Sequence, residues 1–298
     1  MGFFLNPVAG STRAGLPPPH MRYKLLTAEQ YARRLRLLIA ESGVLHRRVQ
    51  SVGGRAVIGW GYSFQRNNNS AIWRDAGIDL TTEGWAHLRR IDEAPTGART
   101  LQALAFDKVL TEAEANRLLV ASSREHEIHA NRFELPYSDE RLALVSLTFS
   151  RGTQTLTEAH PLMAALAAGH RAEAWYQLRY NCWGYAADLE AGLRKRRLME
   201  STVFGLYDDP SQVGIDEARQ VAEMIDRHRA EINQVEQRFG QTLAGVEGQR
   251  DLIAQANRDY PGIVSTWGEV PTIREALAPA RNALMAAGLD IGLFNPAP

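Results

Sequence analysis

Apolar positions spaced by three and four residues predict that most of this chain is helical. In residues 27–42, leucine and isoleucine form one stripe and arginines fill the opposite face. Thr27, with Gln30 three residues later, has the capping-box pattern of a helix start. Further helices are predicted over 80–92, 111–132, 138–150, 160–168, 171–179 and 188–203. The helix at 111–132 starts with a second capping box, Thr111 and Glu114.

The pattern changes between residues 49 and 62, where short apolar stretches alternate with glycines. This arrangement predicts a small β-hairpin or a three-stranded ribbon. The segment "QRNNNS" that follows is predicted to be a polar loop. Together with the helices, the ribbon indicates an α+β fold that is predominantly helical.

The last third of the chain differs in composition from the rest. Residues 211–260 are rich in Gln, Glu and Arg, and their apolar positions predict a long amphipathic helix or a helical hairpin. Pro261 and Gly262 interrupt this pattern, and 272–287 is predicted to be a final helix. We therefore divide the chain into three parts: an extended tail at 1–22, an α+β body at 23–208, and a helical appendix at 209–298.

The overall charge narrows the choice of partners. The formal net charge is +0 and the isoelectric point is about 7.1, so no global field favours nucleic acid or anionic lipid.

No stretch approaches the roughly 20 apolar residues of a membrane span. The apolar start of the chain has no basic region before it and is broken at Asn6 and Pro7, unlike a signal peptide. Cys182, the only cysteine, is expected to be a core residue.

Three segments, in order, carry a family resemblance. They are "ESGVLHRRVQSVGGRAVIGWGYSF" at 41–64, "LTEAEANRLL" with the later "LALVSLTFSRGTQTL", and "AEAWYQLRYNCWGY" with "GLRKRRLMESTVFGLY". Together they resemble the phage-type lysozymes, glycoside hydrolase family 24, over about residues 35–208. The resemblance implies a lysozyme-like fold of two lobes and cleavage of the β-1,4 bond between N-acetylmuramic acid and N-acetylglucosamine in peptidoglycan glycan strands.

Glu41 matches the family's catalytic glutamate at a helix end. Glycoside cleavage needs a neutral acid that protonates the leaving oxygen, and a carboxyl group shielded under a sheet could serve as that general acid. The second catalytic position departs from the family pattern. The aspartate expected nine residues later aligns with Gln50 or Ser51, and Val57 replaces a threonine. Tyr62 stands where a histidine is expected.

These departures leave several mechanisms open. Glu41 alone could support lytic transglycosylation, in which the 6-hydroxyl of the substrate attacks and no water is positioned. A relocated acid, Asp75 or Asp79, could instead restore hydrolysis. The alternative from another class is a non-catalytic lysozyme-like protein that binds the cell wall or another partner.

The remaining site predictions concern substrate binding. Gln50 and Ser51 would provide polar contacts, and the resemblance places Tyr62, Phe149, Ser150 and Arg151 along the groove. No cofactor and no metal is expected. The segment "REHEIH" has two histidines three residues apart, which misses the spacing of metalloprotease helices.

The architecture also suggests a route of delivery. A lytic body with an appendix and without an export signal is typical of an antibacterial effector toxin carried by an injection system, or of a phage lysin. We expect synthesis in the cytoplasm, action on peptidoglycan in the periplasm or after specialised secretion, and an immunity or carrier partner bound through 209–298. No nucleic acid partner is expected.

Overall fold

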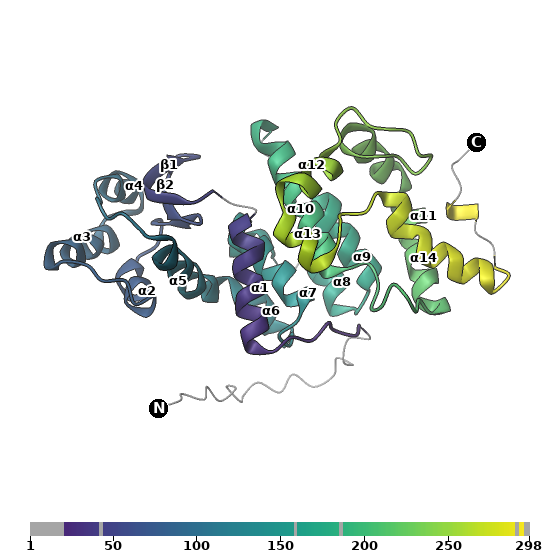
Figure 1. The fold of residues 1–298 in the computed structure, drawn as a ribbon, viewed down its shortest axis with the longest axis horizontal. Coiled ribbons are helices and arrows are strands. Elements are labelled where there is room, and N and C mark those ends of the chain that lie inside the picture. Colours follow the sequence, from purple (N-terminus) through teal and green to yellow (C-terminus); the bar gives the residue numbers. More distant parts are fainter. Residues whose placement is uncertain (1–20, 42–43, 158–159, 185–186, 290–291, 295–298) are drawn as a thin grey trace.

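The computed structural model describes residues 21–41, 44–157, 160–184, 187–289 and 292–294. The molecule is elongated, with a small lobe at one end and a larger helical body that reaches to the other (Figure 1). Helix α1 (Ala28–Glu41) lies between the two. It starts where predicted, because the Thr27 hydroxyl accepts the Gln30 amide at 3.2 Å and the Gln30 side chain accepts the Thr27 amide at 2.9 Å. The predominantly helical α+β fold is confirmed.

The small lobe begins with the predicted ribbon. Strands β1 (His46–Val52), β2 (Arg55–Gly59) and β3 (Tyr62–Ser63) form an antiparallel sheet in the order β1-β2-β3. Gly53 and Gly54 join the first two strands, with φ of 55° and 75°. A two-residue turn with both φ values positive matches the twist of the flanking strands, and glycine adopts it without steric cost.

The next helices along the chain contribute to the small lobe. They are α2 (Asn69–Asp75), α3 (Thr82–Glu93) and α4 (Thr96–Leu104). Trp73 and Phe64, both fully buried, are at the centre of the lobe's own hydrophobic core. Asn69, predicted to lie in a polar loop, instead opens α2 and is fully buried. The carboxylate of Asp92 accepts the backbone and side-chain N–H groups of Asn69, each at 2.8 Å. The buried asparagine therefore keeps hydrogen-bond partners for these groups.

The predicted helix 111–132 is broken into three pieces. Helix α5 (Glu112–Ser123) gives way to a 3₁₀ turn, Arg124–Glu127, and then to α6 (Ile128–Arg132). The Thr148 hydroxyl, from the large lobe, donates to the backbone carbonyl of His126 at 2.8 Å. This contact with another helix lies where the α-helical geometry changes to the 3₁₀ turn.

The large lobe follows. Its helices are α7 (Asp139–Arg151), α8 (Pro161–Ala167), α9 (Arg171–Tyr176) and α10 (Glu190–Phe204), with a π-helical turn at Gln177–Asn181 and 3₁₀ turns at Thr153–Thr155 and Ala187–Leu189. The basic run "GLRKRR" belongs to α10 and has a structural role. Arg196 and Arg197 both bind Glu200, at 3.0 and 2.9 Å, and Glu200 also accepts the Ser146 hydroxyl of α7 at 2.7 Å. This buried cluster fastens α10 to α7.

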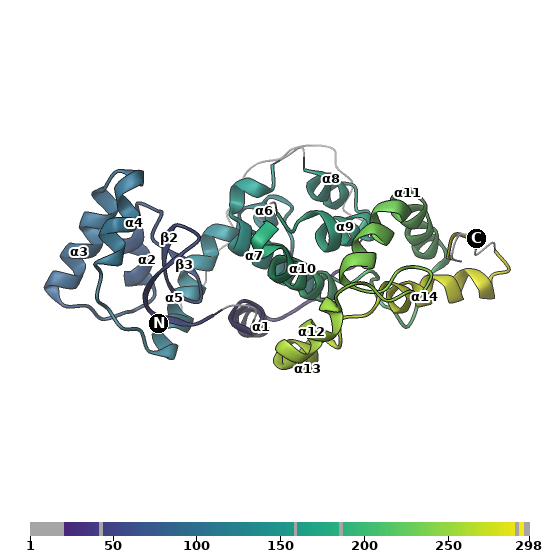
Figure 2. The same cartoon turned by 90° about the horizontal axis from the view of Figure 1, so that it is seen from above.

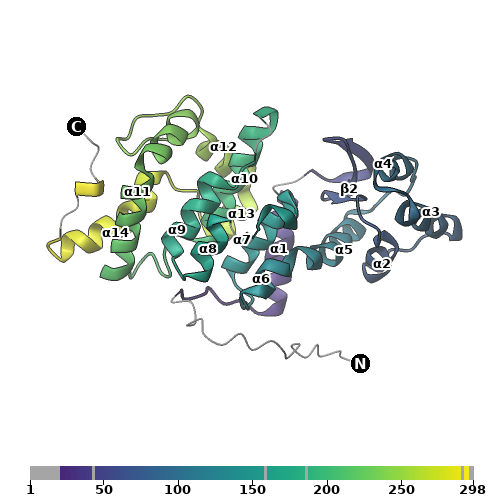
Figure 3. The same ribbon diagram turned by 180° about the vertical axis from the view of Figure 1, so that it is seen from behind.

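The appendix contains α11 (Ile215–Phe239), α12 (Leu252–Asp259), α13 (Pro261–Trp267) and α14 (Ile273–Ala286), followed by a 3₁₀ turn at Gly292–Phe294. Helix α11 packs on α9 and α14, and α12 packs on α10 (Figure 3). The apolar core of the large lobe continues without a break into these helices. The packing is therefore continuous across the predicted boundary near residue 208, and the appendix helices share the apolar core of the body.

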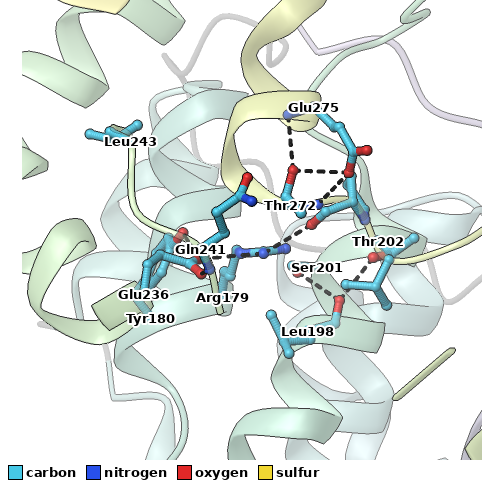
Figure 4. A network of polar contacts seen from close by, with 12 residues as sticks. Arg179, Tyr180, Leu198, Ser201, Thr202, Glu236, Gln241, Leu243, Thr272 and Glu275 are labelled. Atoms are coloured by element: carbon cyan, nitrogen blue, oxygen red, sulfur yellow. Dashed lines mark hydrogen bonds and ion pairs between the residues drawn. The ribbon is translucent and has the colours of Figure 1, made fainter. Parts of the chain in front are cut away.

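A buried polar cluster joins the two parts (Figure 4). Glu236 of α11 accepts the Tyr180 hydroxyl at 2.7 Å and pairs with Arg179 at 3.5 Å. The Arg179 guanidinium also donates to the carbonyl of Pro271, which precedes α14, at 3.1 Å. Both charged side chains are buried, so each compensates for the other's lost hydration.

The tail predicted at 1–22 lies almost wholly outside the described residues. Its two described residues lie against the large lobe: Met21 is buried, and the Arg22 amide donates to the Asp208 carboxylate at 3.1 Å. Among the described residues, no helix has the length and apolar character that a membrane crossing requires.

Candidate active site

Glu41, the predicted general acid, is the last residue of α1 and is partly buried. Its two carboxylate oxygens face the start of α13. Oε1 accepts the backbone N–H of Gly262 at 2.8 Å, and Oε2 accepts that of Ile263 at 2.7 Å. The first N–H groups of a helix have no partner within the helix, and they favour a negative charge in front of them. Glu41 therefore caps a helix of the appendix.

The approach of α13 to Glu41 is very close. A Cβ atom added to Gly262 would lie 2.3 Å from Oε1 and 2.9 Å from Cδ of the glutamate. A larger side chain at this position requires the Glu41 carboxylate or the start of α13 to shift. The guanidinium of Arg34, two turns earlier in α1, lies over the Trp267 ring at 5.4 Å, at the other end of α13. The two helices thus lie side by side, and two views show them adjacent (Figures 1 and 2).

The positions at which the family pattern places a second carboxylate lie on the hairpin. Gln50 and Ser51 are exposed on β1, and Gln50 pairs across the ladder with Val57 of β2. Val57 is buried, at 8% exposure. None of these three side chains carries a charge that could stabilise an oxocarbenium-like centre. The roles of Gln50 and Ser51 as polar contacts for the glycan stay predictions.

Asp75, one of the acids considered as a replacement, lies at the end of α2. It lines a hollow of about 400 Å³ together with Arg36, Arg117 and Arg124, and its carboxylate is 3.7 Å from Arg124. Arg36 and Glu41 are five residues apart in α1, so their side chains leave the helix roughly 140° apart. The hollow therefore opens on a different face of α1 from Glu41. This geometry gives no support to Asp75 as the second catalytic group.

Tyr62 is held inside the small lobe. Its side chain is 2% exposed, and its hydroxyl donates to the Asn69 side chain at 2.6 Å. The guanidinium of Arg66 lies over one face of the ring at 4.8 Å. In this structure the tyrosine fixes the end of the hairpin to α2 and offers no open face to a sugar.

Phe149 lies where the two lobes meet. Its ring is beside the turn between β2 and β3, since a Cβ atom on Gly61 would lie 3.9 Å from Cε1. On the other side it meets the His126 ring edge to face, with centroids 5.1 Å apart. Sequence reasoning gave His126 no role in the site. It belongs to the break between α5 and α6, which the sequence did not indicate.

Ser150 and Arg151, predicted to bind sugar hydroxyls and carboxylates, have different surroundings. The Ser150 hydroxyl accepts a hydrogen bond from Arg197 at 2.7 Å and donates to the carbonyl of Leu147 at 2.9 Å. It is therefore part of the cluster that joins α10 to α7. The Arg151 guanidinium lies against Gly184, where an added Cβ would be 2.3 Å from its Nη1. The structure brings Phe149, Ser150 and Arg151 together at the end of α7, and their contact with substrate stays a prediction.

The His126 side chain makes stability depend on pH. Burial, together with the nearby charge of Arg66, lowers the pKa of His126 from 6.5 to about 4. Between these values the unfolded state binds more protons than the folded state, so stability falls as the pH is lowered from 6.5 towards 4 and is fully present above 6.5. The shift corresponds to about 3 kcal/mol at most.

We therefore expect His126→Phe, which keeps the ring packing, to flatten the pH dependence. The measurement is the free energy of urea unfolding at steps between pH 4 and 7. His170→Gln changes an exposed histidine and is the matched control. Identical slopes for the wild type and His126→Phe would show that His126 does not titrate as the structure requires.

The other polar candidates have structural partners. The His129 ring nitrogen Nε2 forms a hydrogen bond with the carbonyl of Thr153 at 2.7 Å. Within the described ranges, no three His, Cys, Asp or Glu side chains are grouped so that they could bind a metal. Cys182 is buried, and burial raises the pKa of its thiol to about 12, so it remains protonated.

The residues that sequence reasoning missed are Gly262 and Ile263. A signal for α13 itself was present, because proline is favoured at the first position of a helix. Pro261 was interpreted only as an interruption of the preceding helix. Nothing in the local pattern indicated that this helix start meets a glutamate 221 residues earlier in the chain.

Comparison with known proteins supports the resemblance. The family model of phage lysozymes matches residues 43–200, which include the hairpin, the end of α7 and the arginine-rich part of α10. No curated protein and no solved structure matches the chain. The matched segment covers more than half of the 298 residues. The chain therefore belongs to the phage lysozyme family, whose members cleave peptidoglycan.

Proposed function

We propose that the protein cleaves the β-1,4 bond between N-acetylmuramic acid and N-acetylglucosamine, with Glu41 as the proton donor. The observation that carries this proposal is the position of Glu41 at the end of α1, directly before the hairpin of a phage lysozyme domain. A carboxylic acid placed there can protonate the glycosidic oxygen as the C1–O bond breaks.

The second half of the reaction follows from the missing second carboxylate. Gln50, Ser51 and Val57 can neither act as a base nor stabilise a positive centre as an anion does. The Glu41 carboxylate, having given its proton away, can instead take the proton from the 6-hydroxyl of the same muramic acid. That oxygen then bonds to C1 and forms a 1,6-anhydro ring. Each proton and each bond is accounted for with one glutamate and no positioned water.

The products distinguish this reaction from hydrolysis. Purified sacculi are digested with the full chain, and the soluble fragments are analysed by mass spectrometry. Lytic transglycosylation gives anhydro ends, which are 18 Da lighter than the reducing ends of hydrolysis because no water is added. Reducing ends would show that water is the acceptor and would overturn the single-glutamate mechanism.

A second candidate function is binding of the wall glycan without cleavage. The observation that favours it is the contact of both Glu41 oxygens with α13, which gives the glutamate a structural partner. Pull-down with insoluble sacculi that stay intact during incubation would support this function. Release of soluble fragments would exclude it.

For the biological setting, we propose an antibacterial effector or a phage lysin that acts on peptidoglycan outside the cytoplasm and meets a carrier or immunity partner through 209–298. The support is architectural: a helical appendix is added to the lytic domain and packs on its large lobe. The test is co-purification of the full chain from its native host. A partner that still binds when exposed appendix side chains are replaced would contradict the assignment to 209–298.

A further inference from the structure

Helix α13 covers the carboxyl group on which the proposed reaction depends. Both oxygens of Glu41 accept backbone N–H groups, from Gly262 at 2.8 Å and from Ile263 at 2.7 Å. A general acid must bring one oxygen within about 3 Å of the leaving oxygen of its substrate. Because the Cβ position of Gly262 is only 2.3 Å from Oε1, no sugar fits between this oxygen and the helix.

From this geometry we propose that α13 is a built-in cap that keeps the protein latent. In the capped state Glu41 serves as an acceptor for the helix start, and cleavage requires α13 to move away. This inference rests on the proposed role of Glu41 as proton donor and adds the regulation of that same group.

The way α13 is held agrees with a removable cap. Ile263 is its only fully buried side chain, whereas α14 buries five residues and α11 buries eight. Gly268 ends the helix with a φ of 89°, a conformation that glycine adopts freely. A short helix held by one fully buried side chain and the partly buried Trp267 opens at a lower free energy than the packed helices beside it. The cap can therefore leave while α11 and α14 keep their core.

Contacts beside the cap fix its register on the body. Lys195 of α10 binds Asp259, the last residue of α12, and its ammonium lies 5.1 Å from the centre of the Tyr260 ring. Tyr260 directly precedes α13. At the far end Trp267 receives the Arg34 guanidinium at 5.4 Å. These contacts align the first two amides of the short helix with the carboxylate.

Gly262→Ala is the direct test. The added methyl group collides with the Glu41 carboxylate, so either that side chain or the start of α13 must shift and the contact is lost, whereas alanine itself suits a helix better than glycine. Gly97→Ala is the matched control, because Gly97 is likewise the second residue of a helix, α4, and its Cβ would meet nothing within 4 Å. Ile263→Ala is a second variant, which removes the apolar anchor without a collision at the carboxylate.

Two readouts are measured on the full chain. Hydrogen exchange of the Gly262 and Ile263 amides reports the contact itself, since these amides have no acceptor within their own helix. Dye release from labelled sacculi reports cleavage. We expect Gly262→Ala and Ile263→Ala to lose the protection of both amides and to cleave at least about tenfold faster, because two hydrogen bonds to a charged group are lost. Gly97→Ala should match the wild type in both.

The outcomes separate the two proposals. If the amides lose protection and an active wild type gains no rate, latency is overturned and the proposed function stands. Unprotected amides in the wild type also overturn latency. If protection changes as expected but no variant releases dye, the proposed function is overturned, and latency falls with it.

Discussion

Glu41→Gln is expected to lower the rate of wall-glycan cleavage by about 100-fold or more. Glutamine has nearly the shape of glutamate but has no acidic proton to give to the leaving oxygen, and general acids contribute rate factors of this size. The substitution also replaces one of the oxygens that face α13 by an NH₂ group, which repels the amide it meets. The variant is therefore expected to release the cap and still to cleave slowly.

The control for this loss is a glutamate with a similar contact and no proposed chemistry. Glu275 is exposed, and its Oε2 accepts the backbone amide of Thr272 at 2.8 Å at the start of α14. Glu275→Gln should change stability slightly and leave dye release unchanged. If Glu41→Gln also kept the wild-type rate to within a few-fold, Glu41 would be a helix cap and not the proton donor.

The second large effect concerns stability. Glu236→Ala is expected to lower the free energy of unfolding by about 3–5 kcal/mol, because it leaves the buried Arg179 guanidinium without its counter-charge. It also removes the acceptors of the Tyr180 hydroxyl and of the Gln241 amide, which lie at 2.7 and 3.2 Å. This cluster joins α11 to the π-helical turn of the large lobe (Figure 4).

The measurement is urea unfolding followed by circular dichroism. Asp216→Ala is the control, since Asp216 and Arg219 form an exposed pair on the same helix, 3.5 Å apart. Removing a solvated partner should have no measurable effect. A loss in Glu236→Ala as small as in this control would mean that the appendix is not fastened to the body through Glu236.

Local features of the fold could be predicted from the sequence. The capping boxes at Thr27 and Thr111 start α1 and α5 as expected, because both depend on side chains within three residues of each other. The paired glycines at 53–54 likewise fix the hairpin. The single helix predicted over 111–132 was wrong, and at its break the His126 carbonyl accepts the hydroxyl of Thr148 from another helix, a contact that the local pattern does not contain.

In the candidate site, too, local features could be predicted from the sequence and long-range contacts could not. The position of Glu41 at a helix end and the absence of an acid at Gln50 and Ser51 could be recognised from their sequence neighbours. What surrounds Glu41 could not, because its partners are 221 and 222 residues away in the chain. Tyr62, expected to face the groove, is buried in the core of the small lobe, where its hydroxyl donates to Asn69.

The contact between Glu41 and α13 links the proposed chemistry to the fold of the whole chain. The phage lysozyme match ends at residue 200, and α13 lies well beyond it. A segment outside the matched residues thus contacts Glu41, the group on which the proposed reaction depends. The cleavage rate of a variant without the Glu41–α13 contact therefore tests both the role of Glu41 as proton donor and the role of α13 as a cap.

The most direct measurement compares Gly262→Ala with the double variant Glu41→Gln/Gly262→Ala in the release of soluble fragments from purified sacculi. The uncapped single variant should cleave rapidly, and the double variant should be at least about 100-fold slower. Equal rates for the two would contradict Glu41 as the proton donor.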